Sequence, residues 1–71
     1  MTTAYAFDVF ISPRDPERVA KEQELLPLIA SYGGILSDRG EDDYHIQLTF
    51  DFQDRDVARK AADAVSALAV R

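Results

Sequence analysis

The sequence contains no cysteine and no tryptophan, a single histidine, and only three glycines and three prolines. Without cysteine, neither a disulfide nor a thiolate metal site can reinforce the chain. Nucleophilic catalysis needs an activated side chain beside a base, yet His45 is the only imidazole and no serine lies in a nucleophile-elbow motif. We therefore predict no catalytic residue, no metal and no cofactor, and the pattern favours a protein that is not an enzyme.

Long apolar runs and basic segments are also missing. No apolar run approaches the roughly 20 residues of a membrane helix, and residues 1–6 show no basic cluster followed by an apolar stretch, so no signal peptide is expected. Thirteen acidic residues against eight basic ones give a net charge of −5, which repels phosphate backbones and anionic membranes. We expect a cytoplasmic protein with no direct nucleic-acid or membrane partner, and the acidity favours docking onto a basic protein.

The length of 71 residues predicts a single α/β domain, 1–71, and the hydrophobic fraction of 46% is normal for a globular chain. A domain of this size buries only about 60% of the surface that its unfolded chain exposes. A second copy or a larger partner is the remaining way to bury more surface, because no cysteine is present. Dimerisation or complex formation is therefore favoured.

Three segments have the pattern of strands. Tyr5 to Ile11 alternates, with its odd-numbered apolar residues on one face. Ile35 to Asp38 is a short second strand, followed by a turn over residues 39–42. Tyr44 to Phe52 alternates most clearly, which predicts a strand buried on one face only.

Two further segments have helical periodicity. Asp15 is predicted to cap the first helix, with Pro16 at its first position and Gly33 at its left-handed end. Pro27 should kink this helix or divide it into two. The apolar positions expected on its buried side are Val19, Leu25, Leu26, Leu28, Ile29 and Tyr32. Asp54 is predicted to cap a second helix. The buried stripe expected there is Val57, Ala61, Val65 and Leu68.

The predicted fold class is α+β, with the element order β-α-β-β-α. A right-handed crossover makes the first two strands parallel, and the long third strand fits between them. The result is a two-layer sandwich in which a three-stranded antiparallel or mixed sheet of order 1-3-2 carries both helices on one face. This topology resembles a ferredoxin-like domain that lacks its last strand. That superfold hosts many unrelated functions, so the resemblance implies no specific activity.

The first candidate partner-binding surface is the sheet face that no helix covers. In a symmetric hairpin, Ile35 lies opposite Ile46 in the core, and Leu36 lies opposite His45 on the uncovered face. The residues predicted on that face are Asp8, Phe10, Leu36, His45, Gln47, Thr49 and Asp51. The apolar pair of Phe10 and Leu36 among polar residues is typical of an interaction patch. The alternative is that Phe10 is simply an exposed aromatic residue.

The second candidate is the outer edge of the first strand, where a fourth strand pairs in complete ferredoxin-like domains. This edge invites a strand from a second copy or a partner, unless Asp8 and Pro13 blunt it. The third is an acidic turn, interpreted as solvated or as a contact for a basic partner, with a hard cation such as calcium as a further alternative. Its residues are Asp38, Glu41, Asp42 and Asp43.

The function favoured by these observations is a protein-interaction module. It would bind and modulate or inhibit another protein through the open sheet face, the first-strand edge or the acidic turn. In size and charge the chain resembles phage-encoded counter-defence inhibitors of the anti-CRISPR type, which implies a nucleic-acid-binding complex as target. The alternatives are a small-molecule-binding regulatory domain that acts as a dimer, and a small ferredoxin-like enzyme in which His45 and Asp8 or Tyr44 handle protons.

Overall fold

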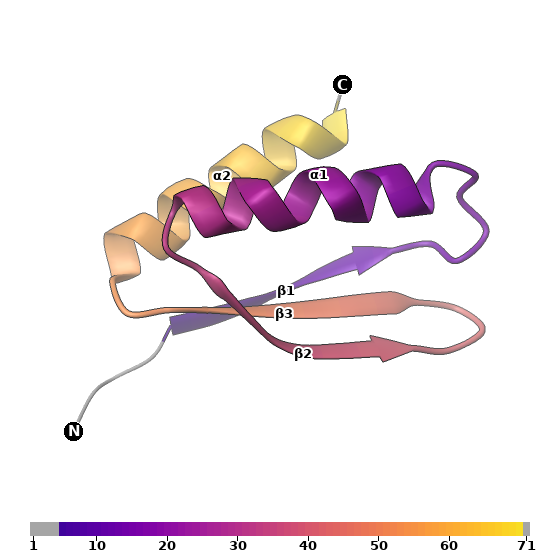
Figure 1. Ribbon diagram of the computed structural model, residues 1–71, viewed down its shortest axis with the longest axis horizontal. Helices are drawn as coiled ribbons and strands as arrows, with labels where there is room; N and C mark the ends of the chain where they lie inside the picture. Colours follow the sequence, from indigo (N-terminus) through magenta and orange to yellow (C-terminus); the bar gives the residue numbers. More distant parts are fainter. Residues whose placement is uncertain (1–4, 71) are drawn as a thin grey trace.

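A computed structural model describes the backbone of residues 5–70 and the side chains of residues 5–68. The elements are β1 (Tyr5–Ile11), α1 (Arg18–Ser31), β2 (Ile35–Glu41), β3 (Ile46–Phe52) and α2 (Arg55–Val70). Strand β3 lies between β1 and β2 and runs antiparallel to both. Both helices cover the same face of the sheet (Figure 1). The predicted α+β sandwich with strand order 1-3-2 is confirmed.

The core lies between the sheet and the helices, and β3 supplies its centre. Every second residue of β3 is buried, from Ile46 to Phe52. Strand β1 pairs with β3 without irregularity, so its odd-numbered residues face the same helices. The ring of Phe7 stacks on that of Phe52, with centroids 5.3 Å apart. The helices complete the core with four buried residues, which are Leu25, Ile29, Ala58 and Ala61.

Helix α1 begins at Arg18, two residues later than the predicted start at Pro16. Asp15 does not cap the helix. Its carboxylate instead accepts a hydrogen bond from the backbone N–H of Glu17 at 2.8 Å and binds the Lys21 ammonium at 2.5 Å. The Lys21 hydrogen bond, followed by that from Glu17, holds the pKa of Asp15 below its ordinary value. Asp15 therefore shapes the turn that leads into the helix.

The end of α1 follows the predicted pattern. Gly33 adopts a left-handed φ of 78° and donates its N–H to the carbonyl of Ala30, while the N–H of Gly34 reaches the carbonyl of Ile29. These two bonds satisfy carbonyls that the last turn would otherwise leave free. Pro27 does not divide the helix, which is continuous from Arg18 to Ser31.

The buried stripe of α1 is narrower than predicted. Leu25 and Ile29 are buried, but Val19 and Leu26 are exposed. This part of the prediction is wrong because α1 lies over the β2 side of a sheet only three strands wide, so just one row of its side chains meets the core.

Helix α2 matches its prediction. The carboxylate of Asp54 accepts hydrogen bonds from the N–H groups of Asp56 and Val57, as an N-cap does. Ala61 is fully buried, and the rest of the predicted stripe packs against the core. Within residues 5–70, neither helix has the length and apolar character needed to cross a lipid bilayer.

The hairpin of β2 and β3 is not symmetric, and its predicted register is wrong. Strand β2 extends to Glu41, the turn spans residues 42–45, and β3 begins at Ile46 instead of Tyr44. A bulge at Ser37 adds one residue to β2, and its hydroxyl donates to the carbonyl of Thr49 at 3.2 Å. The bulge changes which residues of β2 face the helices.

We predict that Gly34→Ala destabilises the fold. A Cβ at this position would lie 2.5 Å from Cγ2 of Ile29 and 2.6 Å from the ring of Phe52. Overpacking of this kind costs about 1–3 kcal/mol. Gly40→Ala is the matched control, because its Cβ would meet only the Gln47 side chain at an ordinary 3.6 Å. Urea unfolding followed by circular dichroism measures both variants, and equal stabilities would contradict the prediction.

Candidate functional site: the open sheet face

The sheet face opposite the helices is built from three rows, each with one residue from β1, β3 and β2. The pairing of β3 with both neighbours fixes which residues share a row. The rows are Phe10, Gln47 and Gly40; Asp8, Thr49 and Asp38; and Ala6, Asp51 and Ile35. We call these nine residues the open face. Of the residues predicted there, Asp8, Phe10, Gln47, Thr49 and Asp51 lie on it.

A hydrogen-bonded chain runs through the middle of the open face. The Thr49 hydroxyl donates to Oδ1 of Asp8 at 2.5 Å and accepts from Nε2 of Gln47 at 2.7 Å. These bonds link β1 to β3 through side chains as well as through the backbone. They also fix the position of the Asp8 carboxylate, so it presents its charge at a defined place.

One corner of the open face is aromatic. The side chain of Phe10 is 60% exposed, and the ring of His45 meets it edge-on with centroids 5.7 Å apart. Nδ1 of His45 lies 3.9 Å from Oδ1 of Asp42. The possible proton-handling pair of His45 and Asp8 is not formed in the described residues, because Asp8 is bonded to Thr49 instead.

Leu36 does not lie on the open face, contrary to prediction. It pairs opposite Phe50 and therefore points to the helix side, while Ile35 lies opposite Asp51 and is 66% exposed. Sequence reasoning missed Ile35 because it assumed a symmetric hairpin. The only local signal was Ser37, a polar residue between an apolar pair and a charged pair.

The acidic turn has divided roles. The carboxylate of Asp42 accepts hydrogen bonds from the backbone N–H groups of Tyr44 and His45, both at 2.7 Å, so it holds the turn together. Glu41 lies opposite Ile46 and pairs with Arg39 at 3.3 Å. Asp43 has no hydrogen bond or ion pair with any other residue of 5–70. Asp43 is thus the turn residue whose charge is available to a partner.

Arg39 belongs to the helix side of the sheet. It pairs opposite Leu48, and its guanidinium binds Glu22 of α1 at 2.7 Å in addition to Glu41. These carboxylates raise the pKa of Arg39, first through the hydrogen bond to Glu22. The positive charge of Arg39 therefore lies on the helix side and does not neutralise the carboxylates of the open face.

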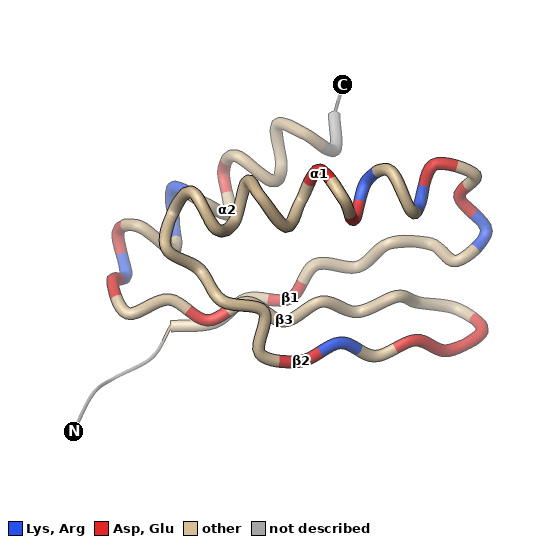
Figure 2. The backbone as a smooth tube through the Cα atoms, viewed as in Figure 1, with Lys and Arg blue, Asp and Glu red and all other residues tan. Residues whose placement is uncertain are grey.

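Charge is segregated between the two sides of the molecule. The open face and the 42–45 turn carry five carboxylates and, within residues 5–70, no Lys or Arg. These carboxylates belong to Asp8, Asp38, Asp42, Asp43 and Asp51. Figure 2 shows the end of the β2–β3 hairpin in red, whereas blue segments lie in the β1–α1 loop, along the helices and in β2. The remaining described Lys and Arg residues lie in the β1–α1 loop and on the helices. The net charge of −5 is thus concentrated on one side.

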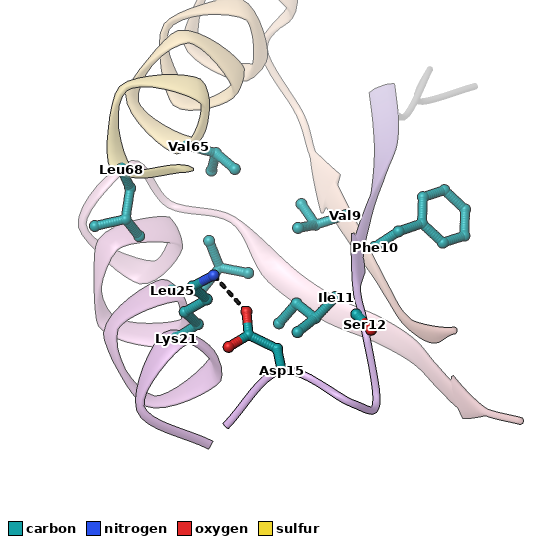
Figure 3. Close-up of a pocket in the computed structure, with 9 residues that line it drawn as sticks. All are labelled: Val9, Phe10, Ile11, Ser12, Asp15, Lys21, Leu25, Val65 and Leu68. Atoms are coloured by element: carbon teal, nitrogen blue, oxygen red, sulfur yellow. Dashed lines mark hydrogen bonds and ion pairs between the residues drawn. The ribbon is translucent and has the colours of Figure 1, made fainter. Parts of the chain in front are cut away.

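Two hollows lie beside the sheet, and the larger one is also lined by Ile35 and Asp51 of the open face. One, of about 150 Å³, is lined by Val9, Leu25 and Val65, with the Asp15–Lys21 pair beside it, and Phe10 points away from it (Figure 3). Another, of about 400 Å³, lies between Tyr32 and Val57. Within residues 5–70, no three His, Asp or Glu side chains are grouped as metal ligands would be.

No protein-family model, curated protein or solved structure matches this chain. The geometry of the open face is therefore the basis for the proposed function.

We predict that Asp42→Ala destabilises the protein at neutral pH and that the effect fades in acid. The hydrogen bonds from Tyr44 and His45 hold the pKa of Asp42 below its ordinary value of 3.8. Because the folded-state pKa is depressed, the stabilisation is present above pH 3.8 and is lost as the pH falls through the lower folded-state value. Thermal melts at neutral pH and well below pH 3.8 measure the difference.

The matched control is Asp43→Ala, which removes the same charge from the same turn but no hydrogen bond. We expect its melting temperature to stay near that of the parent at both pH values. An equal loss in both variants at neutral pH would show that charge, and not the turn geometry, is what Asp42 contributes.

Proposed function

We propose that this chain is a non-enzymatic interaction module that binds a basic surface of a partner protein through its open face and the 42–45 turn. The observation that carries this proposal is the segregation of charge. Five carboxylates gather on one side with no Lys or Arg among them in residues 5–70. An acidic surface raises the rate of encounter with a basic surface and disfavours binding to acidic proteins.

The contacts of the individual carboxylates support this proposal. The carboxylates of Asp38 and Asp51 on the open face and of Asp43 in the turn make no hydrogen bond or ion pair with other residues of 5–70. A partner's Lys or Arg can therefore bind them without first breaking an internal contact. Because Asp38 in β2 and Asp51 in β3 are held by the pairing of these strands, little ordering is needed when the partner binds.

Apolar side chains at two opposite corners add contact area. Phe10 with His45 occupies one corner and Ile35 occupies the other, across a polar middle. Exposed aromatic anchors contribute a large share of the binding energy in many interfaces, whereas rim charges act mainly on rate and specificity. The open face thus combines an acidic centre with two apolar anchors.

The partner class that fits this surface is a nucleic-acid-binding protein. Such proteins carry grooves lined by Lys and Arg that are built to neutralise phosphates. A flat array of carboxylates on a rigid sheet can occupy such a groove and exclude the nucleic acid. An inhibitor of the anti-CRISPR type is one form of this proposal, as is any regulator that blocks a basic groove in the same way.

We predict that Asp38→Lys weakens capture of such a partner about tenfold or more, because it places a like charge against the partner's basic surface. Asp63→Lys is the matched control, since it makes the same change of net charge at an exposed position of α2. The partner is identified by capture from the native host, and titration calorimetry then measures both variants. Equal losses in the two variants would contradict the proposal.

We predict that Phe10→Ala weakens the same complex with little effect on folding, because Phe10 is exposed and contacts only the exposed His45 ring among aromatic residues. A loss of about tenfold is expected if Phe10 is an anchor. The measurement is the dissociation constant, with a thermal melt to confirm that the variant is folded. Unchanged affinity would remove the Phe10 corner from the interface.

A further inference from the structure

The two edges of the sheet differ in how they are protected. The β2 edge contains a bulge at Ser37 and the charged residues Asp38, Arg39 and Glu41, features that discourage pairing with another strand. The β1 edge has neither a bulge nor a proline within Tyr5–Ile11, and its single charged residue is Asp8. The Asp8 side chain is bonded to Thr49 on the open face and does not block the edge.

The helix-side residues of β1 are incompletely covered. Ile11 is buried, but Phe7 and Val9 are only half-buried and Tyr5 is 37% exposed. The opposite residues of β3 are all buried. Along α2, Val65 and Leu68 are half-buried as well, and they line one hollow together with Val9 (Figure 3). Within residues 5–70, no strand covers this apolar margin.

We propose that two copies of this chain pair antiparallel along β1, with Phe7 opposite the partner subunit's Phe7. The symmetry axis is then perpendicular to the sheet, which keeps the helices of both copies on one side. The three strands of each copy join into one continuous sheet. This proposal goes beyond the binding of a basic partner, since it concerns an edge that the open face does not use.

The second copy is the occupant that the sequence of β1 selects, because in this register the strand is complementary to itself. Tyr5 lies opposite the partner subunit's Val9, and the two Phe7 rings meet at the axis. Tyr5, Phe7 and Val9, which are incompletely covered within one copy, are then covered by the same residues of the other copy. On the open face, Asp8 lies opposite the partner subunit's Ala6, so no carboxylate meets its own copy.

The other registers of the same symmetry are less favourable. A register centred on Ala6 places Val9 beyond the partner subunit's Tyr5–Ile11, so no residue of that strand covers it. A register centred on Asp8 puts this carboxylate directly opposite the partner subunit's Asp8, and like charges in that position are destabilising. A register centred on Val9 pairs Phe7 with the partner subunit's Ile11, which is already buried, and leaves Tyr5 uncovered. Charge and burial therefore both select the register centred on Phe7.

The oligomeric state tests the proposal with the chain alone. Sedimentation equilibrium should give twice the mass of 7.9 kDa. Tyr5→Lys should raise the dimer dissociation constant about tenfold or more, because a charge then faces the partner subunit's Val9. Leu26→Lys, at a position of nearly equal exposure (39% against 37%) on α1, should leave the constant unchanged.

Cysteine pairs test the register, since the chain has no cysteine of its own. An oxidised mixture of Ala6→Cys and Asp8→Cys chains should form disulfide-linked dimers, because residue 6 then lies opposite residue 8 within disulfide reach. Neither variant alone should cross-link appreciably. This readout needs no change on the helix side, so it remains valid should Tyr5→Lys fail to fold.

Three results would overturn the proposal. The first is a monomeric parent chain at all concentrations. The second is a dimer that Tyr5→Lys and Leu26→Lys affect equally, which places the contact elsewhere. The third is stronger cross-linking of Asp8→Cys alone than of the mixture, which assigns the register centred on Asp8. None of these results bears on the acidic open face, which is tested by partner binding, so the two proposals fail independently.

Discussion

The whole fold depends on the burial of alternate side chains along the central strand β3. Ile46 to Phe52 places its even-numbered residues under the helices and its odd-numbered residues, which are all polar, on the other side. Since β3 has a partner on each side, its backbone groups are paired and its faces are fixed. A shift of one residue would bring Asp51 beneath the helices, which no nearby charge could compensate. The facing of β3 and of its regular partner β1 follows from this constraint.

The same alternation explains how much could be predicted. The alternation was enough to predict the facing of β1 and the strand order. It also placed Asp8 and Phe10 on the same face as Gln47 and Thr49. It could not place β2, because Ile35 and Leu36 are both apolar and either one fits the core. A bulge at Ser37 and a turn held by Asp42 decided the choice. The bulge and the turn each contain a hydrogen bond between a side chain and the backbone. Bonds of this kind leave no periodic pattern in the sequence.

Aspartate has three different roles in this small domain, and composition alone does not separate them. Asp15, Asp42 and Asp54 accept backbone hydrogen bonds and set turns or a helix start. Asp8 joins two strands through Thr49. A third group consists of Asp38, Asp43 and Asp51, whose carboxylates lie on one side of the sheet or in its turn without a partner in residues 5–70. Asp56 and Asp63 lie on α2. The net charge indicated an acidic protein, but only the pairing of the strands shows which acids a partner can meet.

The bulge at Ser37 has a consequence for assembly. A sheet with two bare edges can add copies at both ends without limit, which is the route to fibres. Here the β2 edge contains an extra residue and three charged side chains, whereas the β1 edge has no bulge and Asp8 as its single charged residue. In the proposed dimer, growth stops at two copies, because both ends of the joined sheet are then β2. In that assembly, the inserted serine and the charges beside it would keep the particle closed.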